Sequence, residues 1–196
     1  SSAIFGANRV SESEVLEVVR RSLMKGWAEY VSLCDFASSG EEDLQRALIY
    51  VKAIKRHVDT HISLTSRLPQ DTSSVDEAYG AGVDAIAYEL SNARAGFDHA
   101  LHILKHAARI FSRGSVSTML ILDRENEEFI ERSLEPLVES GIYPILSYRL
   151  SDGAVTDDPL EIRQAVKMFR RLGISTRRAK FEMGWVPHAL AVIHSV

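Results

Sequence analysis

Short apolar strands alternate with amphipathic helices along most of this chain, and the alternation constrains the fold more than any other feature. The expected strands are 30–34, 60–65, 84–90, 115–122 and 143–149, and the expected helices after them are 41–57, 73–80, 96–112, 126–140 and 158–173. Parallel strands need a crossover between them, and crossovers are nearly always right-handed. The sequence therefore predicts an α/β fold with a parallel sheet.

A helix precedes the first strand. Ser11 and Glu14 have the spacing of a capping box, and apolar residues follow at helical intervals up to Gly26. The predicted fold is a partial TIM-type barrel, with about five parallel strand–helix units after this leading helix, in one incomplete barrel domain over residues 1–196. Beyond Gly173 the periodicity weakens, so the pattern assigns no structure to a tail at 174–196.

The composition argues against several classes of function. The formal net charge is -4, and Lys and Arg are spread out, so we expect no nucleic-acid partner. No apolar run approaches the roughly 20 residues of a membrane span and no basic leader precedes the first helix, so we expect a cytoplasmic protein without a membrane partner. Cys34 is the only cysteine, which excludes a disulfide framework or a cysteine-only cluster within this chain.

Strand alternation separates large side chains from small or polar ones. Large apolar residues such as Leu64, Ile86 and Leu146 suit the face beneath the helices. The opposite set is Ser32, Cys34, His61, Ser63, Thr65, Ala85, Ala87, Glu89, Ser117, Ser147 and Arg149. An ordinary barrel is filled with bulky branched residues, so a small and polar inward set predicts a lumen that binds a small molecule at the carboxyl ends of the strands. The predicted lumen residues are His61, Ser63, Ser117, Ser147 and Arg149.

Glu89 stands at the end of the strand 84–90, where the chain leaves the core. A carboxylate is costly to bury without a partner. Glu89 either faces the polar lumen, opposite His61 or Arg149, or is a structural carboxylate that pairs with an arginine or caps the next segment. The residues alone leave both interpretations open.

Other polar clusters have simpler interpretations. His99, His102 and His106 share a face of the helix 96–112 at a spacing that could ligate zinc, but that helix lies outside the barrel, so we expect a solvated face and no metal site. The acidic stretch "RENEE" at 124–128 is interpreted as a helix start. No G-x-S-x-G, H-E-x-x-H or Walker motif occurs, which argues against an ordinary hydrolase.

Four stretches in succession resemble the barrel of radical S-adenosylmethionine enzymes, particularly biotin synthase and the hydrogenase maturase. They are "VSESEVLEVVRRSLMKGWAEYVSL", "GVDAIAYELSNAR", "SVSTMLIL" and "ESGIYPILSYRL", within residues 9–150. The resemblance implies a six-unit partial barrel whose first strand leads into a CxxxCxxC loop, with this sequence beginning after that loop. The sequence departs from the family in lacking the cysteine triad, in "CDFASSG" (34–40) where the family is glycine-rich, and in lacking a glycine after the strand of "TMLILDRENEE".

The resemblance also implies cofactor-binding residues. Glu89 matches an acidic residue that contacts cofactor or substrate, Arg109 lies near an arginine that binds the cofactor carboxylate, and Met119 and Leu120 match an apolar pair beside the adenine. The implied cofactor is S-adenosylmethionine, with a [4Fe-4S] cluster only if an upstream segment supplies three cysteines. Without that segment the chain cannot perform the reductive cleavage typical of the family, so its status as an enzyme stays open.

Three functions follow from different classes. The chain is the core of a radical S-adenosylmethionine enzyme whose cluster segment lies outside this sequence, or a cluster-free relative that binds a nucleoside-type or other small molecule, or a non-catalytic scaffold or assembly subunit. An incomplete barrel exposes a sheet edge that an N-terminal segment, the tail after Gly173 or a second copy must cover. We expect self-association as a dimer through this edge.

Overall fold

The predicted order of elements is confirmed by the computed structural model, which describes residues 11–34, 41–90, 96–122, 126–148 and 159–181. The elements are α1 (Glu12–Met24), β1 (Tyr30–Cys34), α2 (Glu41–His57), β2 (His61–Arg67), α3 (Ser73–Ala81), β3 (Ala85–Leu90), α4 (Phe97–Ile110), β4 (Val116–Leu122), α5 (Glu127–Glu139), β5 (Tyr143–Tyr148) and α6 (Pro159–Arg178). In this part of the chain, none of the helices combines the length and the apolar character needed to cross a bilayer.

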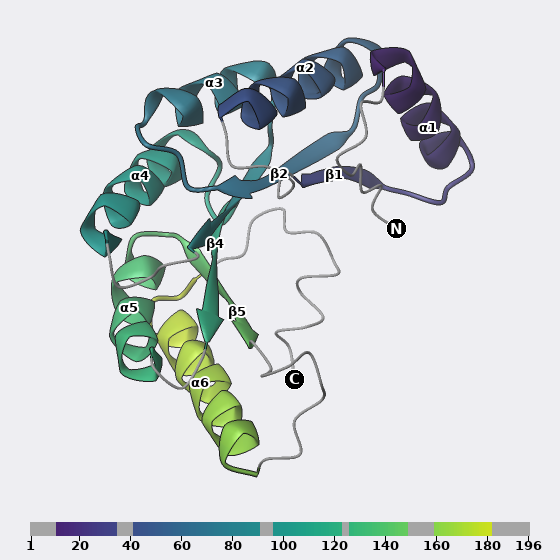
Figure 1. The fold of residues 1–196 in the computed structure, drawn as a ribbon. Helices are drawn as coiled ribbons and strands as arrows, with labels where there is room; N and C mark the ends of the chain where they lie inside the picture. The colour runs from purple at the N-terminus through teal and green to yellow at the C-terminus, as the bar shows by residue number, and fades with distance from the viewer. Residues whose placement is uncertain (1–10, 35–40, 91–95, 123–125, 149–158, 182–196) are drawn as a thin grey trace.

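The five strands form one parallel sheet in the order β1-β2-β3-β4-β5. Sequential parallel strands with a helix in each crossover are the pattern of a TIM barrel, and this chain forms part of one. Figure 1 shows the sheet curving with its helices on the outer side, so the inner face is concave. Within the described residues, β1 pairs only with β2 and β5 only with β4, so both outer strands have an open edge.

The expected division of side chains between the two faces is confirmed. The largest apolar residues of the central strands, such as Leu64, Ile86 and Tyr88, are at most 1% exposed and pack beneath the helices. Burying such a side chain contributes about 1.5–3 kcal/mol relative to leaving it exposed. The strands therefore fix the core on the helical side. The concave face holds small or polar side chains on β2 and β3, and also the larger Met119, Tyr143 and Ile145 on β4 and β5.

The first helix begins as expected, and the last helix ends later than expected. At α1 the capping box is confirmed, because Ser11 N donates to Glu14 Oε2 at 2.8 Å and Glu14 N donates to Ser11 Oγ at 3.3 Å. At α6 the expected stop at Gly173 is wrong, and the helix continues to Arg178. A single interior glycine costs a helix only about 1 kcal/mol, and the buried Leu172 keeps this turn on the core.

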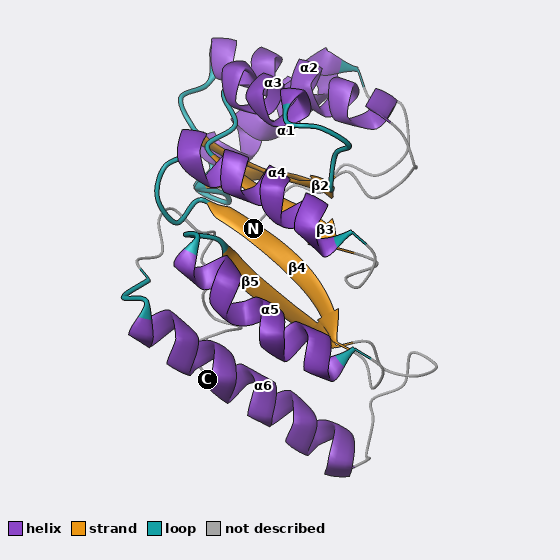
Figure 2. Ribbon diagram, turned by 90° about the vertical axis from the view of Figure 1, so that its left-hand side faces the viewer, coloured by secondary structure: helices purple, strands orange, loops and turns teal. Residues whose placement is uncertain are grey.

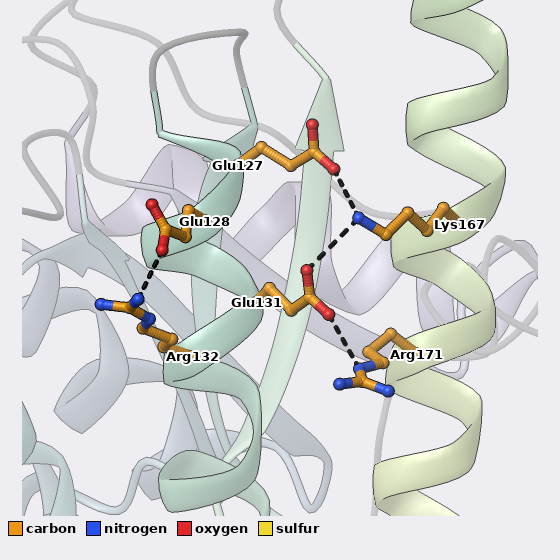
Figure 3. A network of polar contacts seen from close by, with 6 residues as sticks. All are labelled: Glu127, Glu128, Glu131, Arg132, Lys167 and Arg171. Atoms are coloured by element: carbon orange, nitrogen blue, oxygen red, sulfur yellow. Dashed lines mark hydrogen bonds and ion pairs between the residues drawn. The ribbon is translucent and has the colours of Figure 1, made fainter.

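Helices α5 and α6 are joined by a charged network (Figure 3). Lys167 Nζ lies 3.0 Å from Glu127 Oε1 and 3.4 Å from Glu131 Oε2, and Arg171 Nε lies 3.0 Å from Glu131 Oε1. The hydrogen bond from Lys167 to Glu127, with the nearby carboxylates, raises the pKa of Lys167. Glu127 and its neighbour Glu128 form the acidic first turn of α5, as expected for a helix start.

A second polar cluster ties α2 to the sheet at the amino ends of the strands. Lys55 Nζ donates to Asp84 Oδ2 at 2.7 Å and to Thr60 O at 3.0 Å. The same Asp84 oxygen accepts the backbone N–H of Ile62 at 2.7 Å. One carboxylate therefore connects the start of β2, the start of β3 and the last turn of α2, and we call this group the Lys55–Asp84 cluster.

Tyr88 yields a prediction of pH dependence. Its burial beneath the helices raises the pKa of the phenol well above 10, the ordinary value. As the pH rises above about 10, the unfolded chain loses this proton before the folded chain does, so stability is lost in that direction. Tyr88→Phe should remove this contribution. Between pH 9 and pH 11, the free energy of unfolding of the wild type should therefore fall by about 1.4 kcal/mol more than that of the variant.

Urea unfolding of both proteins at pH 8, 9, 10 and 11 tests this expectation. Tyr143, whose pKa burial also raises, is present in both proteins, so its contribution cancels in the difference. Parallel stability curves for the two proteins would show that Tyr88 does not cause the alkaline loss.

Candidate functional site

The parallel register arranges the inward side chains in rows across the concave face. One row close to the carboxyl ends of the strands contains Arg67, Glu89, Met119 and Ile145. We call it the carboxyl-edge row. The row below it contains Cys34, Thr65, Ala87, Ser117 and Tyr143. In TIM barrels, ligands bind at the carboxyl ends of the strands, so the carboxyl-edge row is the candidate site.

Arg67 and Glu89 are direct register partners on β2 and β3. Their Cα atoms are therefore about 4.8 Å apart, and both side chains project from the concave face. Glu89 is partly buried and Arg67 is exposed. Among the described residues, neither side chain has a hydrogen-bond or ion-pair partner, although a carboxylate and a guanidinium lie on adjacent strands. The two side chains thus project from neighbouring positions on the same face, and no other described residue pairs with either of them.

Apolar and small side chains adjoin this pair. Met119 on β4 is the register partner of Glu89 and is partly buried. Ile145 on β5 is in turn the register partner of Met119. One row below, Ala87 and Ser117 are register partners, and Ser117 Oγ donates weakly to Ile86 O at 3.4 Å. A ligand with one apolar part and two charged groups would find complementary surfaces here.

The expectation that Glu89 lies opposite His61 is wrong. His61 begins β2 and Arg67 ends it, so His61 lies about 20 Å from the carboxyl-edge row along the strand. Its ring nitrogen Nδ1 is 3.9 Å from Asp84 Oδ2, at the amino edge of the sheet. His61 thus belongs beside the Lys55–Asp84 cluster and not beside Glu89.

The predicted lumen serines do lie on the concave face, at three different heights. Ser63 pairs in register with Ala85 and is buried, two rows below Glu89. Ser117 lies one row below Glu89, and Ser147 lies one row above it as the register partner of Ile121. Arg149 is outside the described residues. Ser117 and Ser147 are therefore the predicted lumen residues closest to the carboxyl-edge row.

Two residues implied by the family resemblance lie away from this face. Leu120 is fully buried beneath the helices, because adjacent strand residues project to opposite faces and Met119 takes the concave one. Arg109 is exposed in the last turn of α4. Since a crossover helix runs antiparallel to its strands, this turn lies toward their amino ends. Of the four implied cofactor residues, Glu89 and Met119 share the candidate site, and Leu120 and Arg109 do not.

The three histidines of α4 face away from the sheet interior. His106 Nε2 lies 2.8 Å from Asp76 Oδ1 on α3, and His99 and His102 are exposed. The described residues contain no group of three side chains positioned to hold a metal ion.

Sequence reasoning missed Arg67. The expected strand ended at Thr65, and the observed strand continues for two more residues. Alternation contained the signal, because Ser63, Thr65 and Arg67 have the same parity and therefore share a face. An arginine at a strand end provides no apolar signal for extending the strand, so the sequence pattern does not identify the register partner of Glu89.

One cavity of about 400 Å³ lies elsewhere, lined by Arg113, Glu139, Gly141 and Phe181 among others. Gly141 immediately precedes β5, and Glu139 ends α5, so this cavity opens near the amino edge of the sheet. It does not include any residue of the carboxyl-edge row.

No protein-family model matches this chain, and no curated protein matches it either. Among solved structures it is similar to an aldolase designated QR15, with 19% identity and a TM-score of 0.53 over 91% of this chain and 75% of the aldolase. It is also similar to a 7,8-dihydropteroate synthase from Vibrio fischeri, with 14% identity and a TM-score of 0.56 over 88% of this chain and 69% of the synthase. A third similar structure is a putative deoxyribose-phosphate aldolase from Toxoplasma gondii, with 11% identity and a TM-score of 0.54 over 93% of this chain and 70% of the aldolase. These similarities establish the barrel-like fold and add no support for the radical S-adenosylmethionine resemblance.

Proposed function

We propose that this chain binds a small molecule at the carboxyl-edge row, with Arg67 holding an anionic group of the ligand and Glu89 a cationic one. The observation that carries the proposal is the adjacency of these two side chains without a partner among the described residues. A partly buried carboxylate is costly to leave unpaired, so a ligand cation is a favourable partner for Glu89. A guanidinium binds carboxylate or phosphate through two parallel hydrogen bonds, which suits Arg67.

The ligand class that fits is an amino acid or nucleoside derivative. Its ammonium and carboxylate groups would meet Glu89 and Arg67, and a flat apolar group would rest on Met119. S-adenosylmethionine has all three features, and it is also the ligand implied by the family resemblance, so it is the first ligand to test. Binding in the mouth of a TIM-type barrel agrees with where such folds place small molecules.

We assign ligand binding, and no reaction, to this site. Two of the structurally similar proteins are named as aldolases and one as a dihydropteroate synthase, which supports a small-molecule ligand without identifying it. A Schiff-base aldolase needs a lysine amine as nucleophile. The described strands β1 to β5 contain no lysine, so we propose binding alone.

Calorimetric titration of the chain with S-adenosylmethionine tests the proposal. Glu89→Gln and Arg67→Ala should each weaken saturable binding at least tenfold, since each removes one charge-assisted contact worth about 1.5–3 kcal/mol. Arg109→Ala is the matched control, because it removes an exposed arginine outside the site. Titrations with methionine and with adenosine show which half of the ligand provides the affinity.

Circular dichroism must show that each variant is folded. Binding that is equal in wild type, E89Q and R67A would overturn the assignment of the carboxyl-edge row. If the folded wild type binds neither S-adenosylmethionine, methionine nor adenosine, the proposed ligand class is wrong and the scaffold hypothesis gains support.

A further inference from the structure

Helix α6 has one covered side and one uncovered side. Among the helices that the structure describes, it is the last of the layer and lies beside α5 alone (Figure 2), with β5 beneath it. Lys167 and Arg171 point toward α5, where they pair with its glutamates, and Met168 and Leu172 are buried against the core. The side that faces away from α5 and the core is therefore where a neighbouring element would pack.

Three arginines form a straight line on this uncovered side. Arg163, Arg170 and Arg177 are separated by seven residues, or two helical turns, so they recur about every 10.5 Å along the helix. All three are exposed. None forms an ion pair with a carboxylate in the described chain, and Arg177 only donates from Nε to Gly173 O within its own helix, at 3.0 Å. We call these three residues the arginine row.

Exposed aliphatic side chains flank the arginine row. Ile162 is 50% exposed and Val166 is 46% exposed, and they lie one turn apart on the same stripe of α6. The two side chains form a small apolar stripe beside the charges, which a partner helix could cover. The stripe and the row together have the form of one half of a helix–helix interface.

We propose that α6 docks an acidic amphipathic helix of a partner protein. The partner's carboxylates, repeating every seven residues, would pair with the arginine row, and its aliphatic residues would cover Ile162 and Val166. Two helices packed at the shallow angle of a coiled coil keep such a seven-residue repeat in register. The acidic character of the partner follows from charge complementarity, because α6 has six basic residues and one acidic residue.

Helix α5 of a second copy would match this face in charge but not in its apolar part. Glu128, Glu135 and Glu139 of α5 are exposed, but no large aliphatic side chain of α5 is exposed beside them to cover Ile162 and Val166. A second α6 would place arginine against arginine, which is repulsive. In α1 the acidic residues occupy only the first half of the helix, and Arg20 and Arg21 follow them. The glutamates of α5 that face α6 are already paired with Lys167 and Arg171. A partner protein therefore fits better than self-association at this face.

The test uses the full chain and a synthetic amphipathic peptide about three heptads long, with one glutamate per heptad beside a leucine stripe. Binding is measured by fluorescence anisotropy, with a scrambled peptide of the same composition as the reference. We expect the heptad peptide to bind at least tenfold more tightly than the scrambled one. The triple variant R163E/R170E/R177E should lose this binding, and a peptide with arginine in place of glutamate should restore it.

A matched control carries the same change in net charge elsewhere. Arg20, Arg56 and Arg109 are exposed arginines on α1, α2 and α4, and R20E/R56E/R109E should bind the heptad peptide like the wild type. Equal binding of both peptides, loss of binding in the control variant, or failure of the charge-swapped peptide to restore binding would each overturn the proposal. Tighter binding of the wild type to anionic lipid vesicles than to the peptide would also overturn it, in favour of a membrane surface.

Discussion

Replacing Asp84 with alanine is expected to lower the free energy of unfolding by about 3 kcal/mol. The carboxylate accepts the backbone N–H of Ile62, a residue that is fully buried, and also pairs with Lys55. Leaving a buried N–H without an acceptor costs about 1–3 kcal/mol, and loss of a partly exposed ion pair adds up to about 1 kcal/mol. Urea unfolding followed by circular dichroism measures the change.

Two further variants separate these contributions. Asp84→Asn keeps an oxygen acceptor for Ile62 N–H and removes the charge, so it should cost less than Asp84→Ala. Lys55→Met leaves the acceptor in place and removes the ion pair, so its cost should be about 1 kcal/mol. If Asp84→Ala changes stability by less than 0.5 kcal/mol, roughly the effect of an ordinary surface substitution, then water satisfies Ile62 N–H and the cluster is not structurally important.

Much of this fold could be predicted because its signals are local. Apolar periodicity located every strand and helix, and the capping box at Ser11 and Glu14 marked the start of α1. Strict strand–helix alternation then implied parallel pairing. The alternation of large and small side chains also placed Glu89 on the concave face, because that choice depends only on parity along one strand.

The site was harder to predict because it depends on register between strands. His61 and Glu89 have compatible parity, but six residue positions along β2 separate His61 from Arg67, the register partner of Glu89. Which residues of two neighbouring strands become register partners is set by how the crossovers pack, and the sequence of neither strand specifies it. The same limit explains the Lys55–Asp84 cluster, in which a lysine of α2 contacts the aspartate that precedes β3 and no sequence motif connects the two.

The family resemblance had a different weakness. It matched Met119 and Leu120 as a pair, yet consecutive strand residues project to opposite faces, so only Met119 reaches the concave side. Strand periodicity, applied to the resemblance, would have removed Leu120 from the site. A residue that a resemblance assigns to a site must therefore also project to the face of the strand on which that site lies.

Gly82→Ala is expected to lower the free energy of unfolding by about 2–3 kcal/mol, for two separable reasons. Gly82 caps α3 with φ +101°, a left-handed conformation that costs an L-residue about 1–2 kcal/mol. A methyl group there would also lie 3.1 Å from Lys55 Cγ. Because two hydrogen bonds hold Lys55 Nζ, the side chain cannot move aside without weakening its contact with Asp84.

Gly96→Ala measures the cost of the left-handed backbone conformation alone. Gly96 has a nearly identical backbone, with φ +93°, and an added methyl group would meet nothing within 4 Å. Its cost should therefore be the conformational strain alone, about 1 kcal/mol less than that of Gly82→Ala. In a Lys55→Ala background the contact is absent, and the two glycine substitutions should cost the same. If Gly82→Ala and Gly96→Ala are equally destabilising in the wild type as well, the Lys55 side chain moves away from the added methyl group at no cost. The Lys55–Asp84 cluster then does not fix the position of the Lys55 side chain.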